Sequence, residues 1–442
     1  MVLSVKSAKV WWTAAAVATA VIVGVVAGTG VAYDRAYASL EHAPAYEVAP
    51  PRELMRPVTP TEVPADERAQ LASRLDQIAG GANLGQFGAV VTDVATGQSV
   101  WERAADEPLR PASSTKLLTS VAAIAQLGSA DQIATEVVKG AQPGELIIKA
   151  QGDVWLDDDA LDELAEGAEE AIDPAELDTA TIAVDVSAWS GERILEGWNP
   201  VDVDAGFVAP MEPLMRYGAR IGQTTGEAPR SHTPAADVAR ALADRLGVEV
   251  AGDVTGAKAA PKAKVIAQTL SPTLAERINQ MMLDSDNVMA EAIGREVALA
   301  RGKDASAKGA TEATLEVLAE HGFNTEGTEL FDNSGLSVKN RISPRLLNQV
   351  LYYAATQAEA RPLLTALPVG GASGTLAHRY SELAGRGWVR AKTGTLDETS
   401  ALAGVVTSQS GHQFTFAFIS NGADVTAARA GADQLASALR EV

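Results

Sequence analysis

The chain has 442 residues, of which 46% are hydrophobic and 21% are charged, so it can hold more than one domain with an ordinary core. Its formal net charge of -21 argues against nucleic acid as a partner, because phosphate binding needs concentrated Lys and Arg. The sequence contains no cysteine, which excludes disulfides, a thiol nucleophile and cysteine-ligated metal.

Residues 10–33 form an apolar stretch without a charge, and two lysines precede it. About 20 apolar residues can span a bilayer as a helix. Because cations before such a span stay in the cytoplasm, the rest of the chain is expected outside it. Two main alternatives remain open for residues 1–38: an uncleaved membrane anchor, or a signal peptide cleaved near Ala36-Tyr37-Ala38. A buried helix of a soluble protein is the third alternative.

The next segment, residues 39–64, is rich in Pro, Glu and Ala and predicts an extended linker to a folded body. The body is expected to begin with a helix at about 65–79. Apolar segments on either side of a Gly-containing turn then predict a hairpin of strands at 87–94 and 98–102. A buried helix is expected to follow at 117–127.

The sequence changes character at residues 151–259, which are interpreted as a smaller domain inserted into a body made of residues 65–150 and 260–442. The acidic patch at 157–170 is interpreted as a solvated helix face, since no histidine or paired ligand spacing accompanies it. Further elements are expected in chain order: a strand at 181–186, a helix at 234–246, strands at 248–254, 387–392, 401–408 and 413–420, and a final helix at 424–440.

The first chemical motif is Ser113-Ser114-Thr115-Lys116, an S-x-x-K sequence expected at the start of a helix. Residues three apart share a helix face, which places the Ser113 hydroxyl near the Lys116 amine. A serine hydroxyl becomes a strong nucleophile when a base removes its proton, and a neutral lysine can be that base. Burial and nearby cations such as Lys392 are expected to lower the pKa of Lys116. The Ser113 N–H is a candidate oxyanion donor.

The second motif is Ser285-Asp286-Asn287. All three residue types also form turns, so the motif is weak when considered alone. Ser285 and Asn287 are expected to point into a cleft, with Asp286 exposed between them. In that arrangement Ser285 could relay a proton between Lys116 and a leaving amine, while Asn287 could hold a substrate amide.

The third motif, Lys392-Thr393-Gly394-Thr395, is expected to follow an edge strand at 388–391 that binds an extended peptide by backbone pairing. Gly394 would let the substrate approach the backbone closely. Lys392, Thr393 and Thr395 would supply a cation and two hydroxyls for a terminal carboxylate. The Thr395 N–H is a candidate second oxyanion donor.

These three motifs in this order are typical of penicillin-binding proteins and class A β-lactamases. The chain resembles the D-alanyl-D-alanine carboxypeptidase/endopeptidase family of low-molecular-mass, class C penicillin-binding proteins (S13-like). The block at 332–344 is similar to that family's D-G-S-G-L-S…N-R-x-S-P, and the block at 367–376 to its L-P-V-A-G…G-T-L. Gly152-Asp153 also fits, and the resemblance extends over about 85–442.

The resemblance implies an α/β (α+β) fold in which an antiparallel sheet is flanked by helices, with a smaller inserted domain. It implies a serine-type D-Ala-D-Ala carboxypeptidase, which could also be an endopeptidase, acting on peptidoglycan stem peptides through an acyl-enzyme on Ser113. Such a protein would bind β-lactam antibiotics and lie in the bacterial cell envelope, without a cofactor or metal. The short separation between Ser113 and Ser285 suggests an insertion reduced relative to the family's usual one.

Two alternatives stay open. A β-lactamase of the same fold would need a fast deacylating base, which the sequence does not identify. A non-catalytic relative that only binds peptidoglycan or a protein partner is opposed by the complete motif set. Other hydrolases are disfavoured, because the chain has no G-x-S-x-G elbow and its five histidines lack zinc-ligand spacing.

Overall fold

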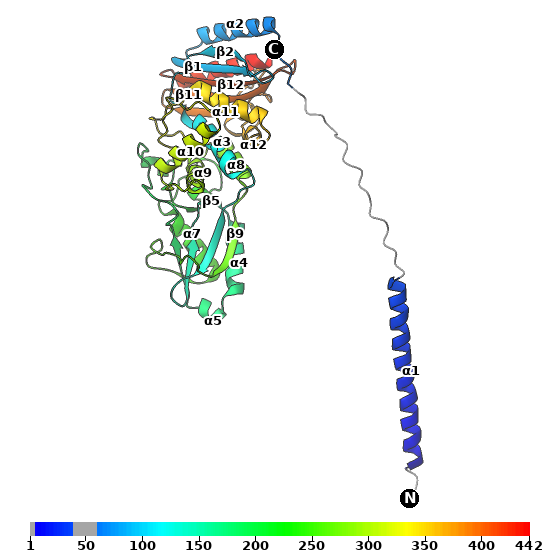
Figure 1. Ribbon diagram of the computed structural model, residues 1–442. Helices are drawn as coiled ribbons and strands as arrows, with labels where there is room; N and C mark the ends of the chain where they lie inside the picture. The colour runs from blue at the N-terminus through cyan, green and yellow to red at the C-terminus, as the bar shows by residue number, and fades with distance from the viewer. Residues whose placement is uncertain (1–4, 39–59) are drawn as a thin grey trace. The chain divides into compact units, whose positions relative to one another are not determined.

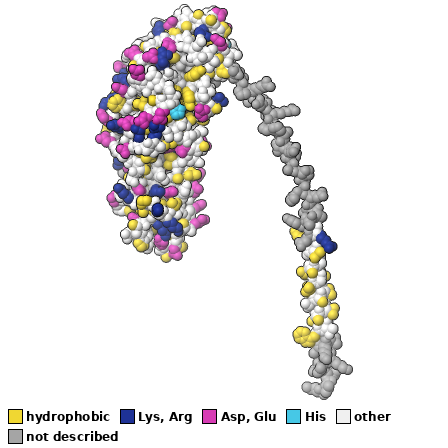
Figure 2. Space-filling model, viewed as in Figure 1, with side chains coloured by type: hydrophobic (Ala, Val, Ile, Leu, Met, Phe, Trp, Pro, Cys, Tyr) yellow, Lys and Arg dark blue, Asp and Glu magenta, His cyan; other side chains and the backbone are white. Residues whose placement is uncertain are grey.

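The computed structural model describes residues 5–38 and 60–442, and the chain forms two units, Met1–Val58 and Thr59–Val442. In the first unit, α1 (Val5–Ala38) is a continuous helix. Its segment Ala15–Tyr33 has a mean hydropathy of 2.1 and is long and apolar enough to cross a membrane. Figure 2 shows its hydrophobic side chains exposed along the helix. Most of the predicted linker at 39–64 lies outside the described residues.

The second unit is built on a five-stranded antiparallel sheet with strand order β10-β11-β12-β1-β2. Its N-terminal hairpin therefore pairs with strands from the C-terminal end of the chain, as β1 lies beside β12. Side chains alternate across this sheet, so Phe414, Phe416 and Phe418 of β12 share one face. The strands are β1 (Gln86–Asp93), β2 (Ser99–Arg103), β10 (Arg390–Leu396), β11 (Thr399–Thr407) and β12 (Gln413–Asn421).

Helices cover both faces of this sheet (Figure 1). The phenylalanine face packs against α2 (Ala65–Gly81) and α13 (Val425–Arg440) in one apolar core. The other face packs against a larger core formed mainly by α3 (Lys116–Leu127), α8 (Leu274–Asp284), α9 (Asn287–Ala300), α10 (Ala307–Glu320), α11 (Pro344–Thr356) and α12 (Pro362–Ala366). The expected antiparallel sheet flanked by helices is confirmed.

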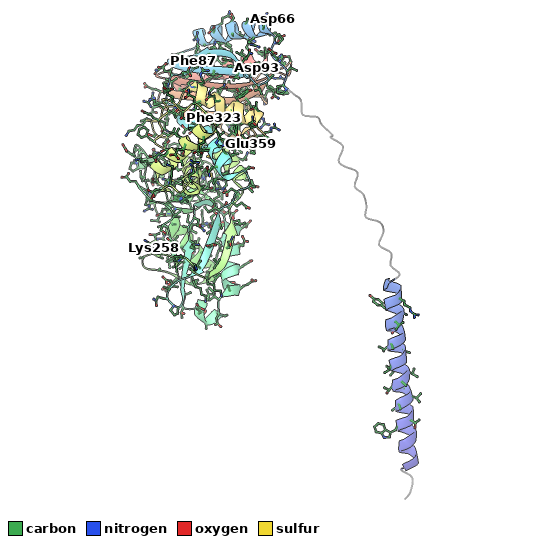
Figure 3. All side chains as sticks on the ribbon, viewed as in Figure 1. Asp66, Phe87, Asp93, Lys258, Phe323 and Glu359 are labelled. Carbon is green, nitrogen blue, oxygen red and sulfur yellow. The ribbon has the colours of Figure 1, made fainter. Side chains whose placement is uncertain are left out.

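A second five-stranded sheet, with order β8-β6-β4-β3-β9, lies at the opposite end of the body from the first sheet (Figure 1). Figure 3 draws the side chains, with Phe87 on β1 near α2 and Lys258 at the opposite end. The strands are β3 (Ala134–Lys139), β4 (Glu145–Lys149), β6 (Thr181–Asp185), β8 (Glu249–Val250) and β9 (Val265–Leu270).

Two helices, α4 (Asp158–Ala171) and α7 (Pro234–Leu246), pack with this sheet around a third apolar core. The acidic patch at 157–170 is thus largely the helix α4, which buries its leucines and exposes most of its carboxylates. The remaining elements of this part are β5 (Asp153–Leu156), which pairs in parallel with β7 (Leu214–Arg216), the short helices α5 (Pro174–Leu177) and α6 (Val201–Asp204), and the 3-10 turn η2 (Tyr217–Ala219).

The structure differs from the sequence-based boundaries in two places. The second sheet begins before residue 151 and ends after residue 259, because β3 pairs with both β4 and the distant β9. Residues 134–270 are therefore called the insertion below. The predicted strand at 387–392 is shifted, since β10 begins at Arg390 and contains the whole Lys-Thr-Gly-Thr motif.

Candidate active site

The S-x-x-K motif lies at the junction of a 3-10 turn, η1 (Ala112–Thr115), with α3. A 3-10 helix has about three residues per turn, so side chains three apart eclipse one another. The Lys116 Nζ accordingly lies 3.0 Å from the Ser113 Oγ. The expected proximity of these two side chains is confirmed, although the helix type that produces it differs from the prediction.

Lys116 is fully buried and its Nζ has two further partners. It donates to the Asn287 Oδ1 at 2.7 Å and to the backbone oxygen of Ser334 at 2.7 Å. Both of these oxygens can only accept a hydrogen bond. A neutral amine has two N–H donors and one lone pair, so the two oxygens take the donors and the lone pair is left for the Ser113 hydroxyl.

Burial lowers the pKa of Lys116 to about 8, while the charges of Asp332, Asp286 and Glu291 act in the opposite direction. Burial, together with the charge of Lys116, also holds the pKa of Lys392 well below its usual value. Burial, one of the two causes expected from the sequence, is the main cause of the lowered pKa of Lys116. Burial is also the largest cause for Lys392, and the charge of Lys116 adds to it.

The second motif joins the end of α8 to the start of α9. Ser285 adopts a left-handed backbone conformation with φ of 57° at the C-terminus of α8. Asp286 is the N-cap of α9, and its side chain accepts from the Met289 N–H at 3.0 Å. Asn287 donates through Nδ2 to the backbone oxygen of Phe207 at 3.0 Å. The expectation that Asp286 is exposed was wrong, since its side chain is completely buried between two arginines.

The third motif lies on β10, which is an edge strand as predicted. The Lys392 Nζ donates to the Ser285 Oγ at 2.8 Å, which joins the second and third motifs. Gly394 was expected to let a substrate approach the backbone, and the structure gives a further reason for a glycine at this position. A β-carbon there would lie 2.6 Å from the Pro111 oxygen, so the glycine permits β10 to pack against the turn that carries Ser113.

The two threonines of the third motif lie on the face of β10 opposite to Lys392 and Gly394. The Thr393 Oγ1 donates to the Thr375 Oγ1 at 2.8 Å, and the Thr395 Oγ1 accepts from the Arg429 Nη2 at 2.8 Å. Arg429 is exposed on α13, whereas Lys392 is buried. The exposed cation beside Thr395 is thus Arg429, a residue that the sequence motifs did not indicate.

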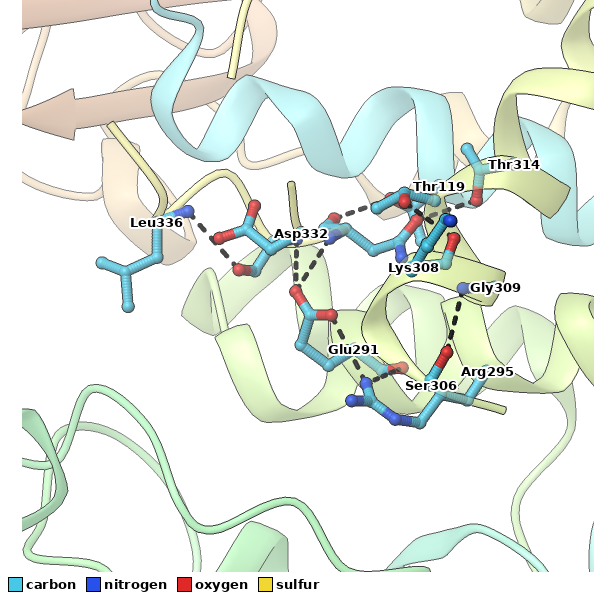
Figure 4. A network of polar contacts seen from close by, with 12 residues as sticks. Thr119, Glu291, Arg295, Ser306, Lys308, Gly309, Thr314, Asp332 and Leu336 are labelled. Carbon is cyan, nitrogen blue, oxygen red and sulfur yellow. Dashed lines mark hydrogen bonds and ion pairs between the residues drawn. The ribbon is translucent and has the colours of Figure 1, made fainter. Parts of the chain in front are cut away.

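Figure 4 shows a buried polar network around Glu291 and Asp332. This network adjoins Ser334, whose backbone oxygen accepts from Lys116. The Glu291 Oε1 accepts from the backbone N–H groups of Asn333 and Ser334 at 2.8 and 2.9 Å. Burial and the charge of Asp332 raise the pKa of Glu291 to about 7, although Arg295 opposes this shift. The sequence resemblance included this part of the chain in the block at 332–344 but implied no role in the chemistry for it. The available signal was Glu291 itself, a charged residue within the apolar segment 288–293 of α9.

The five predicted catalytic residues therefore meet in one site. Ser113, Lys116 and Asn287 form one hydrogen-bonded group, and Ser285 with Lys392 forms a second one. Because Ser285 and Asn287 are separated by a single residue, the two groups adjoin. Their catalytic and substrate-binding roles remain predictions.

Comparison with known proteins places the chain in a family. The profile of the D-Ala-D-Ala carboxypeptidase 3 (S13) family matches residues 68–225 and 217–442. The chain is 41% identical to carboxypeptidase DacB of Mycolicibacterium smegmatis, with 97% of each chain covered. It is 30% identical to the D-alanyl-D-alanine carboxypeptidase of Actinomadura sp., covering 80% of this chain and 81% of that one.

Among solved structures, the chain is similar to penicillin binding protein 4 from Haemophilus influenzae, with a TM-score of 0.70. The match covers 83% of this chain and 97% of that protein at 22% identity, so it supports the fold alone. The matches by sequence support more than the fold. Because the family profile covers most of the body and a relative of 41% identity aligns over nearly its whole length, this chain belongs to the D-Ala-D-Ala carboxypeptidase 3 (S13) family.

Proposed function

We propose that this protein is a serine-type D-Ala-D-Ala carboxypeptidase that trims peptidoglycan stem peptides through an acyl-enzyme on Ser113. The observation that carries the proposal is the hydrogen-bond arrangement of Lys116. Two of its three Nζ partners can only accept, and the third is the Ser113 Oγ at 3.0 Å. With its pKa lowered to about 8, roughly a tenth of Lys116 is neutral at pH 7 and can take the proton of Ser113.

The reaction follows from this arrangement in two steps. Ser113 Oγ attacks the carbonyl carbon of the peptide bond between the two D-alanines as its proton passes to Lys116. The backbone N–H groups of Ser113 and Thr395 are the proposed donors to the oxyanion. When the C–N bond breaks, the leaving amine takes a proton that Ser285 relays from Lys116, and D-alanine departs. Water then hydrolyses the Ser113 ester, which releases the shortened peptide and restores the serine.

The substrate's terminal carboxylate is proposed to lie at the third motif. Thr393 and Thr395 would hold it with their hydroxyls, and Gly394 would keep β10 close to the nucleophile's turn. A free carboxylate at this position would distinguish a carboxypeptidase substrate from an internal peptide. Action on crosslinked peptides is the endopeptidase variant of the same chemistry.

The N-terminal unit supports a location outside the cytoplasm. One apolar helix, Ala15–Tyr33, fits either a membrane anchor or a signal sequence, and both would deliver the catalytic body to the cell envelope. Peptidoglycan is found there. We therefore propose that the body acts on the outer side of the membrane.

A β-lactam should acylate the same serine, because its strained amide presents a carbonyl for attack beside a carboxylate. Penicillin binding protein 4 of Haemophilus influenzae has been solved in complex with a β-lactam, which supports this proposal for a chain of the same fold. The covalent adduct then provides a direct assay of the nucleophile.

The test is intact-mass and peptide mass spectrometry after exposure to penicillin. We expect one adduct, on the peptide containing Ser113, in the wild-type protein and none in Ser113→Ala. Ser114→Ala is the matched control, since the Ser114 hydroxyl bonds inward to the Pro111 oxygen at 2.6 Å. That variant should keep the adduct. An adduct on Ser114, or no adduct on the folded wild-type protein, would refute the proposal.

A second assay measures D-alanine release from a D-Ala-D-Ala peptide and turnover of penicillin. Release of D-alanine with slow loss of the penicillin adduct is expected. Rapid penicillin turnover without peptide hydrolysis would favour a β-lactamase, and peptide binding without any hydrolysis would favour a non-catalytic relative.

A further inference from the structure

The central residue of the second motif, Asp286, is joined to the insertion by two buried arginines. The Asp286 Oδ2 lies 2.5 Å from the Arg220 Nη2 and 3.0 Å from the Arg230 Nη2. The three side chains are almost completely buried, with 0%, 1% and 3% of the Asp286, Arg220 and Arg230 side chains exposed. Both arginines belong to the insertion, more than 50 residues before Asp286 in the sequence.

The two oxygens of the Asp286 carboxylate contact different parts of the molecule. Oδ2 binds the two arginines, while Oδ1 accepts from the Met289 N–H in the first turn of α9. The residues on either side of Asp286 are Ser285, with its left-handed backbone, and Asn287. Any displacement of the arginines is therefore transmitted to the two motif residues through one carboxylate.

The turn that supports the arginines is itself strained. Tyr217, Gly218 and Ala219 have φ values of 49°, 61° and 67°, a left-handed conformation that costs free energy for residues other than glycine. The Tyr217 oxygen accepts from the Arg220 Nη1 at 2.9 Å, and the Gly218 oxygen accepts from the Arg230 Nη1. The same two guanidinium groups that hold Asp286 thus also hold the strained turn.

A separate contact connects the insertion to the site. The backbone oxygen of Phe207 accepts from the Asn287 Nδ2, which leaves the Asn287 Oδ1 facing Lys116. The amide of Asn287 is consequently oriented from the insertion side, while Asp286 restrains the backbone on its N-terminal side. Both contacts reach the second motif from residues 207–230.

We propose that Arg220 and Arg230 are positioning residues for acylation, which hold Ser285 and Asn287 in reactive geometry by clamping Asp286. Within the insertion, the segment 207–230 thereby supports the geometry of the proposed site. This inference rests on the proposed function of Ser113. Stability alone does not account for such a cluster, because buried ion pairs often contribute no more than apolar side chains of similar volume. The position of Asp286 between the motif residues Ser285 and Asn287 does account for the cluster.

The cluster also acts on Lys116 through its charge. Burial by itself would raise the pKa of Asp286, but the charges of Arg230 and Arg220 hold it well below the usual value, so Asp286 is ionised. The charged groups facing Lys116 are Asp332, Asp286 and Glu291, together with the Lys392 amine. Removing the charge of Arg220 leaves Asp286 less compensated, which favours the protonated form of Lys116.

The test compares Arg220→Met, Arg220→Lys and the matched control Arg240→Met. Arg240 lies on α7 of the same insertion and pairs with Asp237 at 2.5 Å, but 54% of its side chain is exposed. Stopped-flow acylation with a fluorescent penicillin gives the limiting acylation rate and the dissociation constant over a range of pH. Thermal unfolding establishes that each variant is folded at the assay temperature.

In Arg220→Met the limiting acylation rate should fall roughly 10- to 100-fold with little change in the dissociation constant, because small displacements of reacting groups have effects of this size. The acid limb of its pH profile, which is the pH range in which the acylation rate rises as Lys116 loses its proton, should move to higher pH. Arg220→Lys keeps the charge but cannot make all the guanidinium contacts, so its rate should fall less and its acid limb should stay in place. Arg240→Met should behave as the wild type.

Acylation rates of folded Arg220→Met within about threefold of the wild type, with the same acid limb, would overturn the inference. If Arg220→Met does not fold, Arg220→Lys decides: a rate within about twofold of the wild type would overturn it in the same way. A failure of the proposed function gives a different result, since the wild-type protein would then not be acylated at all.

Discussion

Gly394 lies directly against Pro111, so that a β-carbon at position 394 would be 2.6 Å from the Pro111 carbonyl oxygen. Pro111 precedes the 3-10 turn that carries Ser113, and the next residue, Ala112, has a φ of 47°. The third motif therefore contains a residue whose missing side chain sets the distance between the edge strand β10 and the proposed nucleophile.

Gly394→Ala should separate β10 from the turn, because the nearest neighbour of the new methyl group is a backbone atom that cannot rotate away. We expect acylation of Ser113 to fall about 10- to 100-fold and the free energy of unfolding to fall by about 1–3 kcal/mol. Gly80→Ala on α2, where no atom lies within 4 Å of the added methyl, is the control. Acylation at the wild-type rate in Gly394→Ala would contradict this explanation.

The variant Lys116→Arg tests whether Lys116 is the base that takes the proton of Ser113. Arginine keeps the positive charge but stays protonated at working pH, so it cannot accept the Ser113 proton. Acylation by penicillin should fall by several orders of magnitude in a protein that remains folded by circular dichroism. Lys339→Arg, at a site where 45% of the side chain is exposed, should have no effect. If Lys116→Arg acylates within about tenfold of the wild type, a difference of about 1.4 kcal/mol, the base is another group.

The pH dependence of acylation should reveal the pKa of Lys116. The base must be neutral, so the second-order acylation rate should rise about tenfold per pH unit below pH 8 and level off above it. The measurement is the rate of penicillin adduct formation between pH 5.5 and 10. A flat profile between pH 6 and 9 would be incompatible with Lys116 as the base.

The same pKa predicts a change in stability. The folded-state pKa of about 8 lies below the usual value, so between about pH 8 and 10 the unfolded chain binds more protons than the folded one. The contribution of Lys116 to the free energy of unfolding should therefore increase with pH in that window. Chemical denaturation of the wild type and of Lys116→Met at several pH values measures this contribution. The free energy of unfolding of the wild type minus that of Lys116→Met should increase from pH 8 to 10.

Thr395→Val tests recognition of the substrate carboxylate. The change removes the hydroxyl that accepts from Arg429 while it preserves the shape of the side chain. Hydrogen bonds to a charged group contribute about 1.5–3 kcal/mol, so kcat/KM for a D-Ala-D-Ala peptide should fall about 10- to 100-fold. An amidated peptide, which lacks the carboxylate, should be affected much less.

Thr407→Val, at the far end of β11, is the control for the substitution itself. Equal losses on the acid and amide peptides would indicate that Thr395 has a structural or oxyanion-positioning role. Arg429→Gln should reproduce the acid-selective loss, because it removes the cation that donates to Thr395.

Local features of the fold were predictable from the sequence. The hairpin at β1 and β2, the helices α2, α7 and α13, and the pairing of Ser113 with Lys116 all depend on residues close together in the chain. Within one turn or one hairpin, backbone geometry determines which side chains are neighbours. Three short motifs in a known order were then sufficient to indicate the chemistry.

The sequence thus determined by itself the motif residues and the local contact between Ser113 and Lys116. Only the tertiary structure decided that Asp286 is buried against Arg220, that β9 completes the sheet of the insertion, and that Gly394 packs on Pro111. These contacts join residues far apart in the chain, and no spacing or periodicity encodes them. Whether a residue is buried depends on which distant segments pack against it. The carboxylate of Asp286, which lies between two polar residues in the sequence, is part of a buried ion pair because the folded insertion places two arginines against it.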